Sequence, residues 1–469
     1  MLDRREFLRS ISKAALGTIL LDSARAQVQR VTKPNIILCM ADDLGWGDTG
    51  FNGNTVIKTP CLDVMAKSGM RFERFYSASP VCSPTRGSCL TGRHPYRYGV
   101  FFANVGHLRK EEISLAEALK TQGYATGHFG KWHLGTLLPN WSGKGKNRKP
   151  AENYMTPGMS GFDEWFSTEY AVATWNPYDP DNAHGKSDVR TLYWHNGWNV
   201  TESLEGDDSR IIMDRVLPFI RNAAKSKRTF LAVIWFHAPH APVVAGPEYR
   251  AMYPKYSEEE QHYYGCITAM DEQIGRLRRN IRELGIAEDT MLWFCSDNGP
   301  EGKDGKSGRS RGSAGPFRGR KRSLLEGGVR VPAILEWPAH VEADTTSNAP
   351  CCTSDYFPTI MDLLGFRIKG QPEPIDGVSL MPLIKKKPFE RPHPIGFQSR
   401  NQLALTGMQY KLYSQNGGKT YALYDLLEDP TESKNLAEKK PQIVKAMQRT
   451  LEKWRESCQE SLAGKDYRG

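Results

Sequence analysis

Three short runs of apolar residues stand out from the polar background of the chain. They span residues 35–40, 230–236 and 291–295, and aliphatic or aromatic side chains fill almost every position in them. A strand covered on one face alternates apolar and polar residues, whereas a continuous apolar run is typical of a strand buried on both faces of a mainly parallel sheet. The pattern therefore predicts three such strands.

Segments with the periodicity of amphipathic helices lie between and after these strands. Ser114 opens one of them, with Glu117 three residues later, which is the pattern of a capping box. Apolar residues recur at helical spacing over residues 264–284, and another helix is expected over residues 354–364, ending at Gly365. This alternation predicts an α/β fold in which a large, mainly parallel sheet is sandwiched by helices.

The pattern changes after Leu383. Beyond it the sequence predicts the strands of a hairpin or meander over residues 402–413 and 421–425, with a glycine-rich turn at residues 416–418. A final amphipathic helix is expected over residues 442–457. We expect a large domain over residues 32–383. A smaller C-terminal subdomain, an antiparallel sheet with a helix, is expected over residues 384–469.

Residues 1–26 predict an export signal. A basic start that contains Arg4 and Arg5 is followed by an apolar stretch at 14–21 and an A-x-A cleavage site at 24–26. The basic start resembles a bacterial twin-arginine signal, and an ordinary Sec or lipoprotein signal is the alternative. No other stretch is long and apolar enough to span a bilayer, so we expect a periplasmic or secreted protein without stable membrane anchoring.

Composition narrows the class of protein. The 39% hydrophobic and 25% charged residues, with a mean hydropathy of -0.55, exclude collagenous, low-complexity and polytopic membrane proteins. There are 63 Lys and Arg against 53 Asp and Glu, and because residues 1–26 carry five basic and three acidic side chains, the net charge falls only from +10 to +8 when they are removed. This surplus predicts a polyanionic partner: nucleic acid, acidic membrane or anionic substrate.

The nine cysteines predict no zinc site, and they leave the pairing of any disulfides open. An exported chain can carry disulfides, but the spacing contains no zinc-type CxxC pair and an odd number leaves at least one thiol unpaired. Cys39 and Cys295 fall in predicted strands, where a thiol acts as a small apolar side chain.

Polar residues follow each of the three predicted strands. Asp42 and Asp43 follow the first, His237 and His240 the second, and Asp297-Asn298-Gly299 the third. Ligands of an open parallel sheet bind beyond the carboxyl ends of its strands, and carboxylate and amide oxygens suit Ca²⁺ or Mg²⁺. An Asp-Asp or Asp-Asn-Gly segment alone is more often a turn or a helix cap, but these segments at the ends of separate strands together predict a metal site.

The most specific segment of the chain spans residues 81–93, VCSPTRGSCLTGR. Its Cys-x-Pro-x-Arg core and the following Leu-Thr-Gly-Arg resemble the signature of the type I sulfatases, the formylglycine-dependent, arylsulfatase-like enzymes of the alkaline phosphatase superfamily. GKWHLG at 130–135 and EGGVRVP at 326–332 are similar to further motifs of that family, and the resemblance continues in order to residues 423–437. It implies an alkaline-phosphatase-like fold and the hydrolysis of sulfate esters.

The resemblance also implies the chemistry of the site. A separate maturation enzyme would oxidise Cys82 to formylglycine, whose hydrated aldehyde attacks the sulfate ester and releases sulfate by re-forming the aldehyde. Pro84 and Arg86 would belong to the maturation signal, and Arg86 would also hold the nucleophilic oxygen. A helix is expected to begin at Cys82, where its dipole favours anionic groups.

The remaining site residues are assigned by the same resemblance. The ligands of a divalent cation, Ca²⁺ or else Mg²⁺, would be Asp42, Asp43, Cys82, Asp297 and Asn298. Lys131 would lie toward the nucleophile and Lys321 toward the sulfate and the leaving oxygen. His133 is expected to be the base that drives sulfate release, and His240 the donor to the leaving oxygen; His237 is a weaker candidate.

The roles of two segments stay open, and two other functions remain as alternatives. Residues 303–322 carry eight basic side chains and one acidic, which fits a solvated loop or a rim for a sulfated glycan better than a nucleic-acid site. Tyrosines and tryptophans over residues 165–198 are either core residues or surfaces that stack on sugar rings. The alternatives to a carbohydrate sulfatase are a phosphoester or phosphonate hydrolase of the same superfamily and, less favoured, a non-catalytic polyanion-binding protein.

Overall fold

A computed structural model describes residues 33–143, 148–179, 193–302 and 308–467 of the protein. The expected export signal, residues 1–26, lies outside the described residues. Within the described ranges, no helix combines the length and the apolar character needed to cross a membrane.

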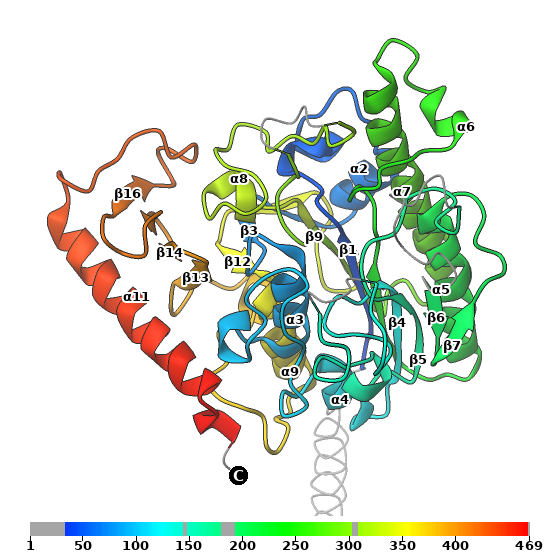
Figure 1. Cartoon of the computed structure of the whole chain (residues 1–469), viewed down its shortest axis with the longest axis horizontal. Coiled ribbons are helices and arrows are strands. Elements are labelled where there is room, and N and C mark those ends of the chain that lie inside the picture. Colours follow the sequence, from blue (N-terminus) through cyan, green and yellow to red (C-terminus); the bar gives the residue numbers. More distant parts are fainter. Residues whose placement is uncertain (1–32, 144–147, 180–192, 303–307, 468–469) are drawn as a thin grey trace, which may run out of the picture. The chain divides into compact units, whose positions relative to one another are not determined.

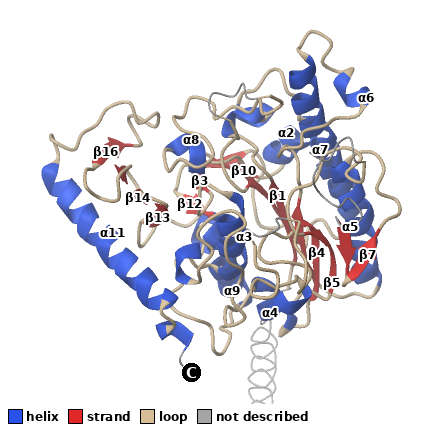
Figure 2. Ribbon diagram, viewed as in Figure 1, coloured by secondary structure: helices blue, strands red, loops and turns tan. Residues whose placement is uncertain are grey.

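A ten-stranded sheet forms the centre of the fold (Figure 2), in the order β11-β2-β10-β9-β1-β8-β4-β5-β6-β7. Its strands are β1 (Asn35–Ala41), β2 (Met70–Phe72), β4 (Ala125–Lys131), β5 (Glu164–Thr168), β6 (Tyr193–His195), β7 (Trp198–Val200), β8 (Phe230–Trp235), β9 (Thr290–Ser296), β10 (Ala333–Glu336) and β11 (Thr345–Ser347). The five consecutive strands β9, β1, β8, β4 and β5 are parallel, and antiparallel pairing begins at β10 and at β6. The predicted mainly parallel sheet is confirmed, with antiparallel strands toward its edges.

Helices cover both faces of this sheet, as the two hydrophobic cores and Figure 1 show. One face carries α3 (Cys82–Thr91), α4 (Leu115–Lys120), α9 (Tyr356–Leu364) and α10 (Met381–Ile384), and the other α2 (Pro60–Lys67), α5 (Asp208–Lys225) and α7 (Glu258–Glu283). Along β1, Ile36 and Leu38 enter the first core and Ile37 and Cys39 the second. Because helices exclude water from both faces of the sheet, strand β1 needs apolar residues at every position.

The predicted strands and helices are present, with shifted ends. The capping box of Ser114 and Glu117 is formed, and Gly365 ends α9 in the left-handed conformation, with φ of 64°. Helix α7 begins at Glu258, six residues before the predicted start, because Ser257 and Glu260 form a second capping box. Two short helices, α6 (Pro247–Arg250) and α8 (Glu326–Val329), and a small parallel pair, β3 (Phe75–Tyr76) with β12 (Cys351–Cys352), complete this part.

The sequence pattern does not predict β4, because glycines interrupt its apolar character. Gly130 has φ of 101°, and a Cβ there would lie 1.9 Å from the carbonyl oxygen of Trp235 in the neighbouring strand β8. Only glycine fits this close approach of two backbones. The packing of β4 against β8 therefore requires Gly130, and the same glycine weakens the apolar pattern by which a buried strand is predicted.

The C-terminal part is an antiparallel sheet with one long helix, as predicted. Its elements are β13 (Ile395–Ser399), β14 (Gln402–Thr406), β15 (Tyr410–Ser414), β16 (Ala422–Asp425) and α11 (Pro441–Leu462). Lys411 of β15 is buried and lies 2.9 Å from carboxylate oxygens of both Glu326 of α8 and Glu432. Residues 35–469 form one compact unit. All nine cysteines are free thiols.

Candidate active site

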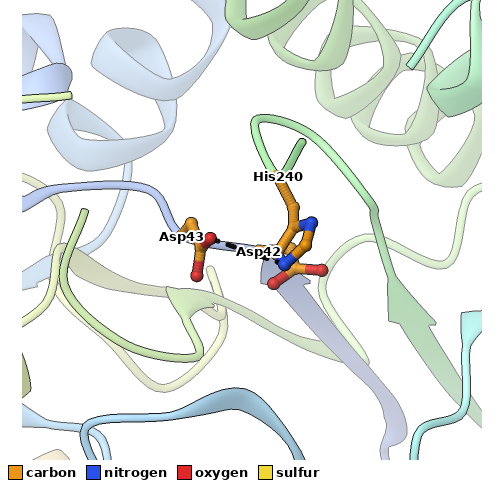
Figure 3. Close-up of side chains that lie close together, drawn as sticks. All are labelled: Asp42, Asp43 and His240. Atoms are coloured by element: carbon orange, nitrogen blue, oxygen red, sulfur yellow. Dashed lines mark ion pairs between the residues drawn. The ribbon is translucent and has the colours of Figure 1, made fainter. Parts of the chain in front are cut away.

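Four neighbouring parallel strands deliver polar side chains to one edge of the sheet. Asp42 follows β1, Asp297 follows β9, His240 lies in the loop after β8, and Lys131 is the last residue of β4. Figure 3 shows Asp42, Asp43 and His240 side by side; the His240 Nε2 lies 3.7 Å from an Asp43 oxygen. The prediction that the strand ends bring these polar side chains close together is therefore confirmed.

Each of the three carboxylates is paired with its own buried cation. Lys131 Nζ lies 2.5 Å from Asp42, Lys321 Nζ lies 2.6 Å from Asp43, and the Arg86 guanidinium lies 2.7 Å from Asp297. Burial and then the Asp42 carboxylate raise the pKa of Asp297 to about 7. Burial acts in the same direction on Asp43, but Lys321, His240 and Lys131 together outweigh it and lower the pKa of that carboxyl.

Two oxygens among these residues are buried and accept no hydrogen bond from the described residues: Asp42 Oδ1 and Asn298 Oδ1. The Asn298 amide donates through Nδ2 to Asp43 Oδ1 at 2.7 Å and to the Gly299 carbonyl at 2.8 Å, which fixes Oδ1 as the free acceptor. Leaving a buried acceptor unsatisfied costs about 1–3 kcal/mol.

The donor set therefore fits a divalent cation. Ligand atoms of Asp42, Cys82 and Asp297 all lie within 4.8 Å of one another. Carboxylate and amide oxygens are the ligands that hard cations take. A cation here would also satisfy the two free oxygens and offset the repulsion between Asp42 and Asp297.

Cys82 is the first residue of α3 and is buried. Burial raises the pKa of its thiol, whereas Lys131 and Lys321 act to lower it, so both ammonium groups lie near the sulfur. Arg86 lies one turn further along α3 and donates through Nη1 to the Lys131 carbonyl oxygen at 3.2 Å. The fold thus brings the predicted nucleophile, its arginine and both lysines together.

The tautomer of His133 can be assigned from its neighbours. Its Nε2 lies 2.9 Å from Asn104 Oδ1, and Arg148 Nη1 lies 3.5 Å from the same oxygen. Because arginine only donates, the amide oxygen faces both groups, and His133 Nε2 must carry the proton. His133 Nδ1 is then the unprotonated nitrogen, and it is buried without a partner among the described residues. Burial, and then Lys131, lower the pKa of His133 well below its usual value, so the ring is neutral.

Asn104 is a site residue that sequence analysis missed. It lies in the loop before α4, 29 residues before His133, has φ of 61°, and donates its backbone N–H to Ser83, the neighbour of Cys82, at 3.3 Å. Asparagine tolerates this left-handed backbone, but asparagines in turns are too common to have marked it.

The two histidines after β8 have different surroundings. His240 Nδ1 lies 2.6 Å from the Ala241 carbonyl oxygen, so Nδ1 carries the proton and Nε2 faces Asp43. Burial, and then Lys321, lower the pKa of His240 to about 3. His237 is fully buried and both ring nitrogens are engaged, at 2.7 Å from Asp208 and 2.7 Å from Thr168, so it supports the loop instead of facing the pocket.

The basic segment before Lys321 is largely engaged with the protein. Its first residues, 303–307, lie outside the described residues. Arg309 and Arg320 donate to carbonyl oxygens, and Glu301, which sequence analysis also missed, pairs with Arg322 at 2.6 Å and with Lys321 at 3.4 Å. Of the aromatic stretch, Trp165 is buried, which fits the core interpretation, and Trp198 is 79% exposed.

Comparisons with known proteins agree with this geometry. The chain matches the family described as Sulfatase over residues 34–366 and the one described as N-sulphoglucosamine sulphohydrolase, C-terminal, over residues 315–457. N-acetylgalactosamine-6-sulfatase of Mus musculus is 31% identical over 404 residues, which cover 81% of this chain and 72% of that protein. Arylsulfatase G of Rattus norvegicus is 34% identical over 372 residues, which cover 72% of this chain and 66% of that protein.

A solved structure gives the same result at the level of the fold. Ps i-CgsB, in complex with k-i-k-neocarrahexaose, superposes with a TM-score of 0.77 at 28% identity, over 90% of this chain and 93% of that chain. The family match covers most of the chain, including every site residue described above. The chain therefore belongs to the sulfatase family, a family of sulfuric ester hydrolases within the alkaline phosphatase superfamily.

Proposed function

We propose that this protein removes sulfate from a sulfated carbohydrate, with a formylglycine made from Cys82 and a divalent cation, Ca²⁺ in preference to Mg²⁺. The sugar part is supported by the names of an N-acetylgalactosamine-6-sulfatase relative and of a structural neighbour in complex with a neocarrahexaose. One observation carries the rest: Cys82 opens a helix beside buried Asp42 and Asn298 oxygens that accept no hydrogen bond from the described residues.

The proposed cation and the proposed formylglycine each have a defined task at this site. When bound, the cation offsets negative charge on the sulfuryl oxygens, and hydrated formylglycine supplies an attacking hydroxyl together with a second hydroxyl that allows sulfate to leave. The residues that would hold the cation are Asp42, Asp43, Asp297 and Asn298. Arg86, anchored on Asp297, keeps the nucleophilic oxygen in position.

Two lysines bind the sulfate group. Lys131 reaches it from the side of the nucleophile and Lys321 from the side of the leaving oxygen. Each ammonium is held by a carboxylate of the metal set, so both positive charges are oriented before substrate arrives. Orientation in advance removes the cost of rearranging these groups during the reaction.

Two histidines move the protons. His133 is neutral and presents Nδ1, which takes the proton of the second hydroxyl during sulfate release. His240 donates to the leaving oxygen through Nε2. Burial and then the lysine charges keep its pKa low. The negative charge of a bound sulfate ester would counteract the lysines, so substrate binding itself would raise the pKa of His240 toward the range where it can donate.

The remaining expectations concern maturation and location. Residues 82–86, CSPTR, would be recognised by a formylglycine-generating enzyme, and residues 1–26 would direct export to the periplasm or beyond, by the twin-arginine route. Residues 32–383 would form the catalytic domain, with residues 384–469 as the C-terminal subdomain.

The test combines chemistry and turnover. The protein is produced with and without a formylglycine-generating enzyme, and the peptide that contains residue 82 is examined by mass spectrometry. Desulfation is then measured on defined sulfated mono- and oligosaccharides for the wild type and for Cys82→Ala. We expect the aldehyde or its hydrate in active protein and no turnover by the variant. Active protein that carries only the thiol, or an active Cys82→Ala variant, would refute the mechanism.

A further inference from the structure

A polar cleft of about 720 Å³ lies between the segment that follows Lys321 and the C-terminal sheet. Arginine, tyrosine and amide side chains line it, among them Arg318, Arg400, Gln402, Tyr413 and Tyr421. None of the described residues that line this cleft is acidic. A concave surface with positive charge, aromatic faces and hydrogen-bonding groups suits an anionic saccharide.

Two contacts connect this cleft to the catalytic pocket. On one side, Gln402 donates to the Arg322 carbonyl oxygen at 2.7 Å and accepts from the Leu324 N–H at 3.0 Å, immediately after Lys321. On the other side, the Arg400 guanidinium lies 4.1 Å from the ring centre of Phe102, in the loop that continues to Asn104 beside His133. The cleft is therefore next to the pocket that receives the sulfate.

The two arginines of the cleft differ from the nearby Arg322 in their partners. Arg318 and Arg400 are exposed, and within the described part of the chain no carboxylate forms an ion pair with either of them. Arg322, by contrast, is held by the Glu301 carboxylate at 2.6 Å. Arg318 donates to the backbone carbonyl oxygen of Glu432 and Arg400 lies against Phe102, so neither contact neutralises the positive charge that an anionic ligand would meet.

Arg400 also occupies a backbone position that does not suit it. Ser399 pairs with Gln402 across β13 and β14, so Arg400 and Asn401 form a two-residue hairpin turn, and Arg400 has φ of 52°. Such turns favour glycine or asparagine, because the left-handed backbone costs other residues roughly 1–2 kcal/mol. An arginine held there, with its side chain against Phe102, indicates a role for the side chain at the expense of stability.

We propose that this cleft binds a second anionic group, a sulfate or a carboxylate, on a sugar unit next to the one that is desulfated. Arg400 and Arg318 pair with the charge, and Tyr413 and Tyr421 contact the sugar faces. The inference takes its class of ligand from the proposed function, and it adds that the substrate is an oligosaccharide with more than one charged unit.

The experiment measures binding without turnover. Cys82→Ala protein is titrated with a heparin hexasaccharide, which carries sulfates and carboxylates, and the Kd is followed with increasing NaCl. We expect Arg400→Asn, which keeps a residue suited to the left-handed turn, to weaken binding about tenfold and to reduce the salt dependence. Arg318→Gln should act in the same direction, and Arg400→Lys should retain most of the affinity.

Arg449→Ala is the matched control, because it removes one exposed positive charge from α11, away from the cleft lining. If it weakened binding as much as Arg400→Asn, or if neither cleft variant changed the Kd while thermal denaturation showed folded protein, the inference would be wrong. Loss of the proposed function is recognised separately, as absent desulfation by mature wild-type protein with an unchanged Kd in the titration.

Discussion

The contact between Asn104 and His133 makes a prediction about turnover. When His133 takes a proton at Nδ1, its Nε2–H bond to the Asn104 oxygen, 2.9 Å long, changes from a neutral to a charge-assisted hydrogen bond. Such bonds contribute about 1 kcal/mol when neutral and about 1.5–3 kcal/mol when charged. The difference, about 0.5–2 kcal/mol, corresponds to about two- to thirtyfold in rate, so Asn104→Ala should lower kcat by a factor in that range. KM should change little, since Asn104 is not among the residues proposed to bind sulfate.

The assay is steady-state turnover of a sulfate ester as a function of pH. Asn104→Asp restores an acceptor, and its carboxylate would raise the pKa of His133, so the acid limb of the kcat profile should move to higher pH. A double-mutant cycle isolates the contact: in a His133→Ala background, Asn104→Ala should have no further effect. An unchanged kcat in Asn104→Ala, or an equal loss in the absence of His133, would refute this account.

Three further predictions concern the metal set and stability. Asp297→Asn should abolish turnover, because it removes a proposed metal ligand and the nearest partner of Arg86; exhaustive chelation should also remove activity, and activity that survives both changes argues against the metal. Lys411→Met removes the ammonium that pairs with the buried Glu432 and with Glu326, which keeps Arg330 at 3.4 Å. It should lower the free energy of unfolding in urea by about 3–5 kcal/mol, whereas an unchanged midpoint would show that this network contributes nothing. Burial lowers the pKa of His94 to about 3, below the unfolded value of about 6.5, so acidification protonates the unfolded state first and His94 should cost about 2 kcal/mol of stability at pH 5. His94→Gln should flatten the stability profile between pH 7 and pH 4, and an identical profile would contradict the shift.

Strands buried on both faces were the most predictable part of the fold. Strands β1, β8 and β9 were predictable because each face of the sheet requires apolar residues, and parallel pairing then brings Asp42 and Asp297 to the same edge. Strand β4 was not, since Gly130 is required by a backbone contact with β8. Helix α5 was also missed; Pro218 interrupts its helical signal. The boundary at residue 383 stays a prediction.

The site was predictable in its residue types but not in its pairings. Motifs marked the carboxylates, lysines and histidines, yet which cation pairs with which carboxylate depends on how four strand ends and α3 pack. Asn104 and Glu301 act through contacts with residues distant in sequence, so no local pattern marks them. The roles of the site residues remain proposals that the variants above test.

The pairings have a consequence for the choice between sulfate and phosphate. When the three carboxylates are ionised, Arg86, Lys131 and Lys321 match their charges one for one. The proposed divalent cation would add two positive charges, which an ionised nucleophilic oxygen and a sulfate monoester anion would offset. A phosphate monoester dianion would leave one uncompensated negative charge in a buried pocket, which is costly. Because the second phosphate pKa is about 6, the preference in kcat/KM for an aryl sulfate over an aryl phosphate should narrow below that pH. A preference that stays constant from pH 8 to pH 5 would show that shape, not charge, excludes phosphate.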